Sequence, residues 1–289
     1  MVNNNVKRKD HRAGKSLSPA RRLEIQKQRK AKLGGLSPTA FGRQRALELL
    51  DWISQWGYTT RALAQKKSGS SKHGICNRLV KQGWLAETFT ATGLPVSSFF
   101  TLTAEGLHEV ENRAEKLNRY SYLDPQRVHQ NLLRHNLAVQ SFTLDALLSG
   151  QIKSFETDKA NSAKSLNGIK QPDCVWHMAK DDAINVKDGD IWAIEFEYTR
   201  KWDRSFDEFR TKVVRALIAE KFNAFHLVTD VPGIKKAYSD GMLPGKKIPQ
   251  HALDKNKKWC IYGDPLIIPP FIGKGGPFDK FVCHLIKSK

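Results

Sequence analysis

Apolar positions in the first half of the chain follow the helical period and then alternate, which predicts a small group of helices that ends in a hairpin. In the helical stretches, apolar side chains recur three and four positions apart, as one buried face of an amphipathic helix requires. Two alternating runs then flank the turn residues 92–95, and they predict the hairpin. The predicted elements are helices over residues 39–55, 59–64 and 72–82, a hairpin over 85–102, and a helix from 103 toward 117.

The second half of the chain predicts a mixed sheet. A long helix, three strands, a second helix and a fourth strand follow one another, and a helix between strands favours a sheet covered on both faces. Leu133, Leu137, Leu144 and Leu148 form one apolar stripe on the first of these helices. Beyond Gly233 the pattern weakens, and residues 265–276 receive no assignment. The predicted elements are a helix over 130–148, a strand over 152–157, acidic strands near 173 and over 191–199, a helix over 203–222, a strand over 224–229, a strand over 259–262, and a strand or short helix over 281–286.

Charge divides the chain further. The net charge is +19, and residues 1–35 hold eleven Lys and Arg against Asp10 and Glu24. We therefore expect a basic, disordered tail over residues 1–36 that orders on phosphate, with nascent helix at 19–32; a purely solubilising extension is the alternative. The predicted domains are this tail, residues 37–119 and residues 120–289.

Composition narrows the class of protein. A hydrophobic content of 40% and seven tryptophans favour globular folding, and the sequence has neither a membrane-spanning apolar run nor a signal-peptide core. The four cysteines are scattered, which indicates reduced thiols and a cytoplasmic location. The basic excess favours nucleic acid as the partner, with an anionic membrane or ribosomal RNA second.

Residues 37–119 resemble a winged helix-turn-helix domain, because three helices precede a hairpin in that order. In that fold the third helix enters the major groove of DNA. Its exposed side chains here are of types that suit base edges and phosphates, although a winged helix used only for protein contacts is the alternative. The predicted DNA-binding residues are Lys72, His73, Asn77, Arg78 and Lys81.

The acidic strands carry the candidate chemistry. Pro172-Asp173 precedes one strand, and in the next, residues 191–199, Glu195 and Glu197 alternate with aromatic residues. Two acids at positions i and i+2 share a strand face at roughly 6–7 Å, where they repel unless a cation lies between them. Paired carboxylates are oxygen ligands for Mg²⁺ or Mn²⁺. A solvated edge strand is the alternative, but three acids in so basic a chain favour a metal that approaches phosphate.

Pro-Asp on one strand and Glu-x-acid on the next resemble the restriction-endonuclease-like superfamily, whose signature is Pro-Asp…(Asp/Glu)-x-Lys, or PD-(D/E)xK. The resemblance implies a mixed α/β nuclease domain. This chain has Glu197 where lysine is usual, and some members of the superfamily carry glutamate there. Lys201 is the first candidate for a displaced lysine, and Lys212 is the second.

Combined with the winged-helix pattern and Arg-His135-Asn-Leu-Ala-Val, these strands look like the MobC-type plasmid mobilization relaxases, which are related to the replication-relaxation proteins. The resemblance covers residues 37–230. It implies site- and strand-specific nicking of a plasmid transfer origin with Mg²⁺ or Mn²⁺, on double-stranded and nicked plasmid DNA, together with an accessory mobilization or coupling protein. The residues implied are His135, Asp173, Glu195 and Glu197 for the metal centre, with Lys201 beside it as a fifth catalytic residue.

Two other classes stay open. The first is a non-catalytic replication or transcription regulator with a degenerate nuclease domain, and the second is a restriction or transposition endonuclease that cuts both strands. No two of the nine histidines are separated by a single residue, so the histidine cluster of the commoner relaxases is missing. Whether a tyrosine forms a covalent intermediate stays open, and the available tyrosines are Tyr198, Tyr238 and Tyr262.

Overall fold

The computed structural model describes residues 18–69, 74–114, 124–161, 168–184, 186–273 and 279–286. Contacts divide the chain into two compact units, Met1–Ala46 and Leu47–Lys289. This division differs from the predicted boundaries. The predicted boundary at 119/120 falls outside the described residues, as do residues 1–17 of the basic tail.

The first unit contains helix α1 (Pro19–Lys32) and the beginning of helix α2 (Pro38–Trp56). Each helix starts on a serine: the Ser18 hydroxyl accepts from the Arg21 amide at 3.4 Å, and that of Ser37 accepts from the Ala40 amide at 3.1 Å. A proline at the first helical position suits both starts, because its missing N–H would have no partner there. The helices expected at 19–32 and from Ser37-Pro38 are therefore observed.

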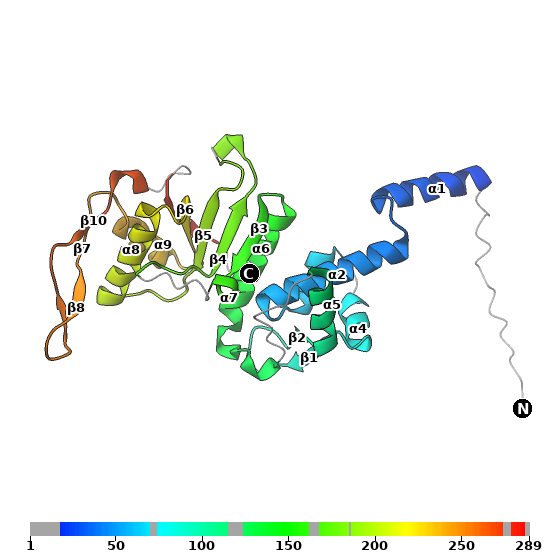
Figure 1. The fold of residues 1–289 in the computed structure, drawn as a ribbon, viewed down its shortest axis with the longest axis horizontal. Helices are drawn as coiled ribbons and strands as arrows, with labels where there is room; N and C mark the ends of the chain where they lie inside the picture. Colours follow the sequence, from blue (N-terminus) through cyan, green and yellow to red (C-terminus); the bar gives the residue numbers. More distant parts are fainter. Residues whose placement is uncertain are drawn as a thin grey trace, which may run out of the picture. The chain divides into compact units, whose positions relative to one another are not determined.

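Residues 47–114 of the second unit have the predicted order of helices and a hairpin (Figure 1). Gly106 allows the last helix to lie close to the hairpin, since a Cβ there would be 2.1 Å from the carbonyl oxygen of Trp84. One expected inward residue is wrong: Val80 is 36% exposed, because the buried face of its short helix is occupied by Ile75, Cys76 and Leu79. The elements are the end of α2, α3 (Arg61–Ser68), α4 (Gly74–Lys81), β1 (Leu85–Phe89), β2 (Ser98–Leu102) and α5 (Ala104–Ala114).

The remainder of the second unit is built on a five-stranded mixed sheet in the order β11-β6-β5-β4-β3. Strands β3, β4 and β5 run antiparallel, whereas β5, β6 and β11 run parallel. The predicted helix–strand–strand–strand–helix–strand order is observed, and the last segment is a strand rather than a short helix. The elements are α6 (Leu133–Leu148), β3 (Ile152–Thr157), β4 (Cys174–Met178), β5 (Ile191–Phe196), α8 (Asp203–Ile218), β6 (Ala224–Thr229) and β11 (Phe281–Leu285).

Helices cover both faces of this sheet. Successive side chains of its central strand point to opposite sides, so each face presents apolar side chains on which a helix packs. On one face, Phe142 of α6 stacks on Trp176 at 5.1 Å and meets Phe196 edge-on at 5.6 Å. On the other face, residues of α8 and α9 (Pro232–Gly241) form one apolar core with Ala193 and the neighbouring strands. Alternation in β5 therefore places its acid Glu195 on the α8 face.

The α6 stripe is only partly as predicted. Leu133 and Leu144 are fully buried, but Leu148 is 53% exposed because the helix ends there, before Gly150. The helix also starts at Leu133 rather than at 130, after two 3-10 turns, η1 (Pro125–Arg127) and η2 (Gln130–Leu132). No helix in the described ranges is both long and apolar enough to cross a membrane.

The C-terminal segment forms two small antiparallel pairs beside α8. β7 (Lys247–Ile248) pairs with β10 (Leu266–Ile267), and β8 (His251–Leu253) pairs with β9 (Trp259–Ile261). The predicted strand near 259–262 is thus half of a hairpin. The unassigned stretch 265–276 contains β10 and a 3-10 turn, η4 (Pro270–Ile272), and its Ile268 and Ile272 join the core under α8.

Candidate active site

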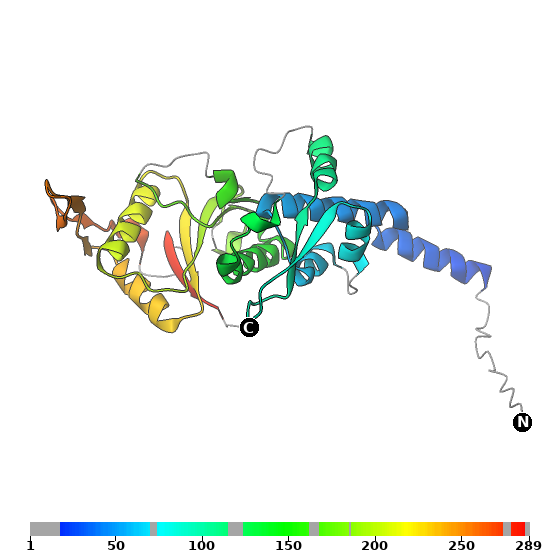
Figure 2. The same cartoon turned by 90° about the horizontal axis from the view of Figure 1, so that it is seen from below.

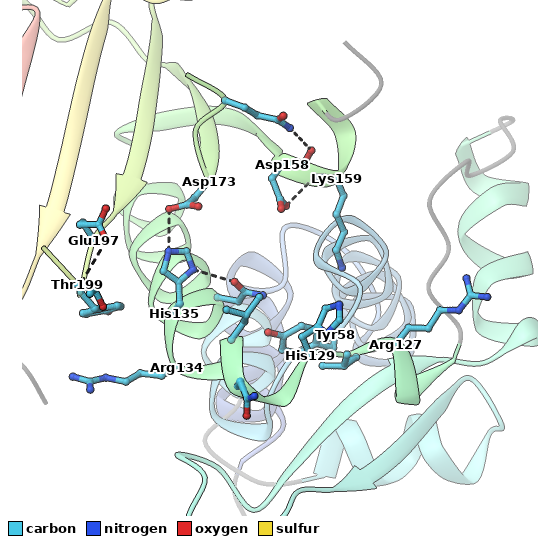
Figure 3. A pocket seen from close by; sticks show the side chains of 16 residues that line it. Tyr58, Arg127, His129, Arg134, His135, Asp158, Lys159, Asp173, Glu197 and Thr199 are labelled. Carbon is cyan, nitrogen blue, oxygen red and sulfur yellow. Dashed lines mark hydrogen bonds and ion pairs between the residues drawn. The ribbon is translucent and has the colours of Figure 1, made fainter. Parts of the chain in front are cut away.

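A cleft of 680 Å³ opens where the start of α6 meets the ends of the acidic strands (Figure 3). Its walls come from segments that are far apart in the sequence. Among them are Tyr58, which precedes the Thr59 bridge to Phe100 of β2, and the loop after β5. Three predicted site residues, His135, Asp173 and Glu197, line the cleft. The lining residues used below are Tyr58, Arg134, His135, Asp158, Lys159, Asp173, Glu197 and Tyr198.

Asp173 and His135 are in direct contact. The Nε2 atom of His135 lies 3.2 Å from Oδ2 of Asp173, and its Nδ1 lies 3.1 Å from Oδ1 of Asn136. The amide of Phe196 donates to the same Asp173 oxygen at 2.7 Å, which fixes the carboxylate against β5. Burial alone would lower the pKa of His135, but the hydrogen bond and negative charge of Asp173 outweigh it and raise this pKa to about 9. His135 is therefore an imidazolium at neutral pH.

Glu195 lies on β5, close to Asp173. The last residues paired between β4 and β5 are Cys174 and Ile194, and Asp173 and Glu195 each come one position beyond them. One oxygen of Glu195 lies 2.7 Å from Nζ of Lys170, and the other, Oε2, is buried with no hydrogen-bond partner. Burial, together with the charge of Asp173, raises the pKa of Glu195 to about 7 although Lys170 and Lys201 oppose the shift. This carboxylate therefore bears an uncompensated desolvation cost.

Glu197 lies just beyond the end of β5 and forms an ion pair with Lys201, four residues later in the chain. The hydroxyl of Tyr238 donates to Oε2 of Glu197 at 3.4 Å, and the Thr199 amide donates to Oε1 at 3.4 Å. Burial lowers the pKa of Lys201, against the attraction of Glu195. The first candidate for a displaced lysine thus lies next to the predicted acids, whereas Lys212 is exposed on α8.

Three acids and three bases consequently form one group, called here the acid–base site. Within the described ranges, no three His, Cys, Asp or Glu side chains are arranged as a metal-ligand cluster. The four-ligand metal set inferred from sequence stays a prediction, since each acid faces a base of the chain. The members of the acid–base site are His135, Lys170, Asp173, Glu195, Glu197 and Lys201.

Sequence reasoning missed Lys170, the partner of Glu195. Its signal was present in Lys170-Gln-Pro-Asp173, which places a lysine three residues before the first acid. The cleft also contains Asp158 and Lys159 from α7 (Asp158–Asn161), a segment for which the sequence predicts no helix or strand. Burial raises the pKa of Asp158 and lowers that of Lys159, whose Nζ donates to the carbonyl of Trp56 at 2.7 Å.

The predicted DNA-binding stripe is partly described. Lys72 and His73 lie outside the described residues, while Asn77, Arg78 and Lys81 are exposed on α4, opposite its buried face. The side-chain oxygen of Asn77 accepts from Arg61 at 2.7 Å, and Arg61 also pairs with Glu87 at 2.9 Å. Asn77 is therefore held by the neighbouring helix, and its amide nitrogen is the group left to face a ligand.

No family model matches this chain, and no curated protein matches it. Among solved structures, the oxidized form of MarR from E. coli is 20% identical, covering 46% of this chain and 93% of MarR, with a TM-score of 0.22. NadR in complex with 4-hydroxyphenylacetate is 14% identical, covering 46% of this chain and 94% of NadR, also with a TM-score of 0.22. Superpositions this poor assign no family to the chain.

Proposed function

We propose that the chain is a divalent-metal-dependent DNA endonuclease that nicks one strand at a plasmid transfer origin, that is, a relaxase. The observation that carries the proposal is the closeness of two carboxylates, Asp173 in the wall of the cleft and the buried Glu195 on β5, whose pKa the charge of Asp173 raises. Glu195 also has a buried oxygen without a hydrogen-bond partner. An acid that is costly to bury and unsatisfied is a common feature of a functional site.

The donor set fits a hard cation. Asp173, Glu195 and Glu197 offer carboxylate oxygens, the ligands that Mg²⁺ and Mn²⁺ prefer, and the unpartnered Oε2 of Glu195 is the atom most in need of a ligand. When bound, such an ion would activate water and neutralise charge on a scissile phosphate. Asp173 and Glu195 are the residues that would hold it, with Glu197 as the third.

The bases have separate tasks in this proposal. His135 has no free lone pair while it is protonated, so it serves as a proton donor to the departing oxygen of the cleaved strand rather than as a metal ligand. Asp173 holds its ring in position. Lys201 and Lys170 offer positive charge to the phosphate, and the burial that lowers the pKa of Lys201 also strengthens its field.

Residues 47–114 would supply DNA binding. Their order of helices and a hairpin is that of a winged helix, and α4 presents Asn77, Arg78 and Lys81 to solvent. We propose that α4 contacts double-stranded plasmid DNA, assisted by the basic tail, with an accessory mobilization or coupling protein as a further partner. Because lysine and arginine contacts release counterions, binding should weaken steeply as salt rises.

The test is a nicking assay with supercoiled plasmid that carries the cognate transfer origin, in Mg²⁺ or Mn²⁺. Asp173→Asn and Glu195→Gln should each lower the rate of open-circle formation by about 100-fold or more, since they remove charge at the reacting phosphate. Asp182→Asn and Asp188→Asn are matched controls, because both acids lie in exposed turns of the same sheet. Circular dichroism should show all four variants folded.

Nicking by Asp173→Asn and Glu195→Gln at the parent's rate would exclude this site. The product ends also separate the nuclease classes. A relaxase leaves a break at one position of one strand, whereas a restriction or transposition endonuclease would linearise the plasmid.

A non-catalytic DNA-binding regulator is the second candidate, and one observation favours it. Each acid of the acid–base site already has a base of the chain as its partner, so the charges could be purely structural. Calorimetric titration with Mn²⁺ discriminates the two. The nuclease hypothesis expects binding that Glu195→Gln abolishes, whereas a regulator would bind no ion there and would still bind DNA.

A further inference from the structure

Residues 250–262 form a hairpin that extends away from α8 and the sheet, called here the projecting hairpin (Figures 1 and 2). Its strands β8 and β9 pair Leu253 with Trp259 and His251 with Ile261, and the Tyr262 amide continues the ladder by donating to the carbonyl of Gln250 at 2.8 Å. Opposed residues share a face, so Leu253, Trp259 and Ile261 lie on one side. Tyr262 lies on the other.

Both sides of the projecting hairpin are in solvent. Every residue from 253 to 265 is exposed, including Trp259 at 52%, Ile261 at 69% and Tyr262 at 71%. A two-stranded hairpin without a packed face is marginally stable in water. Large apolar side chains that gather on such an element mark a contact surface rather than a structural need.

The base of the projecting hairpin is nevertheless fixed to α8. The His251 ring lies 2.9 Å from a carboxylate oxygen of Asp207, and the Gln250 amide donates to the Thr211 hydroxyl at 3.1 Å. Arg204 stacks over the Trp259 ring at 3.9 Å from its centre, which holds the indole plane in place. The aromatic side chains are thus presented on a rigid support.

The positive charge in and next to the projecting hairpin indicates which kind of partner it binds. Residues 246–263 contain five lysines and a single acid, Asp254, whose carboxylate is occupied by the backbone amides of Asn256 and Lys258 at 2.8 Å. Positive charge would repel a basic partner and attract phosphates. Aromatic faces placed among lysines are the arrangement that binds single-stranded nucleic acid, because unpaired bases stack while the backbone follows the charge. The lysines are Lys246, Lys247, Lys255, Lys257 and Lys258.

We propose that the projecting hairpin binds single-stranded DNA, with Trp259 and Tyr262 stacking on bases and the lysines of its turn contacting phosphates. This inference rests on the proposed nicking function, because a nicked strand has a free end that can separate from its complement beside the enzyme. Duplex DNA would bind less well, since its bases are already stacked on one another and present no free face to the two rings.

Cys260 provides a local probe. All four cysteines are described, and three are buried, so Cys260 is the exposed thiol. In the full-length protein with EDTA present, an oligothymidylate should slow modification of Cys260 by a small maleimide about tenfold, because a bound strand covers this residue. A duplex of the same length and vesicles of anionic phospholipid form the comparison arms, and Cys260→Ser should take up no label.

Two triple variants that change the net charge by the same amount show whether the oligothymidylate is bound by the hairpin itself or attracted by the overall charge of the protein. Reversing Lys255, Lys257 and Lys258 to glutamate should abolish protection by the oligothymidylate, whereas reversing the exposed Lys153, Lys180 and Lys187 should leave it in place. Replacing Trp259 and Tyr262 together by leucine should weaken binding of a labelled oligothymidylate about tenfold or more, measured by fluorescence anisotropy.

Equal protection in the two charge variants would overturn the proposal. So would protection by vesicles or duplex alone, which would assign the hairpin to a membrane or to double-stranded DNA. Because EDTA removes metal-dependent chemistry, the two hypotheses fail separately. Protection without nicking would refute only the nuclease function, and nicking without hairpin-dependent protection would refute only the proposal on the hairpin.

Discussion

Two regions beside the same sheet hold histidines in different charge states, one a cation and the other neutral at pH 7. In the acid–base site, Asp173 raises the pKa of His135 to about 9 despite the cost of burial. On β6, burial, together with the nearby His284, lowers the pKa of His226 to about 3. The rings of Trp192, His226 and His284 stack in succession, with centres 4.1 and 4.9 Å apart, and are called here the histidine stack.

The difference shows that the partner of a buried group decides its charge more than its depth does. His226 has a second imidazole as its neighbour, with ring nitrogens 2.7 Å apart, so one ring donates, the other accepts, and both stay neutral. His135 has a carboxylate, so it keeps a proton. The acid–base site therefore holds charged side chains beside the cleft, whereas the histidine stack is neutral and packed.

The largest expected effect is acid sensitivity from the histidine stack. The pKa of His226 is lowered on folding, so its stabilising contribution is complete above about pH 6.5 and is lost as pH falls toward 3. The two pKa values correspond to about 4 to 5 kcal/mol of unfolding free energy. His226→Phe should flatten the dependence of stability on pH in this window, as measured by urea unfolding. His108→Phe, at an exposed histidine, is the control. If unfolding free energy changes with pH equally steeply in both variants, His226 is not the source of the acid sensitivity.

The next effect is of opposite sign and belongs to His135. Its pKa is raised on folding, so its contribution is complete below about pH 6.5 and is lost as pH rises through 9, an amount of about 3 kcal/mol. Asp173→Asn should destabilise the protein by about this much at pH 6 and much less at pH 9.5. The NMR titration of His135 should move well below pH 9, because burial is then opposed only by the contacts with Asn136 and with the carbonyl of Phe196. A titration that stays near pH 9 would show that Asp173 is not the cause.

Glu195→Gln should stabilise the protein, which separates a functional acid from a structural one. The pKa of Glu195 is raised to about 7 on folding, so its ionisation between about pH 4.5 and 7 lowers stability. We expect a gain of about 2 kcal/mol in unfolding free energy at pH 8, less than the full shift implies because Lys170 loses its partner. The gain should vanish at pH 4.5. A loss of stability at pH 8 would make Glu195 a structural residue.

The contrast also separates what the sequence could and could not predict. Alternation in β5 and the position of Asp173 before β4 depend on local pattern, so the two acids and the order of sheet elements could be read from the chain. Lys170 could not, because its contact with Glu195 depends on the path of a loop. The stack of His226 on His284 depends on pairing between β6 and β11, 58 residues apart, which local periodicity does not encode.

Short strands and the ends of helices were the other features that the sequence did not predict correctly. Strands β7, β8 and β10 are two or three residues long, too short to produce a period, so none of them was predicted and residues 265–276 received no assignment. Val80 and Leu148 are exposed for different reasons. Val80 lies off the face that Leu79 and its neighbours bury, whereas Leu148 is the last residue of its helix. Pattern predicts which side of an element is apolar, but not where the covering element ends.

The smallest expected effect comes from charges that resemble those of the acid–base site but are in water. Lys180 and Asp182 lie 3.0 Å apart in an exposed turn before β5, with side chains 65% and 81% exposed. Water and salt screen such a pair, so Lys180→Ala or Asp182→Ala should change unfolding free energy by about 0.5 kcal/mol or less at any pH from 5 to 9. Urea unfolding in low and high salt measures this directly. A change above about 1 kcal/mol would mean that the distance between two charges, rather than their burial, determines how much a charged pair contributes to the unfolding free energy.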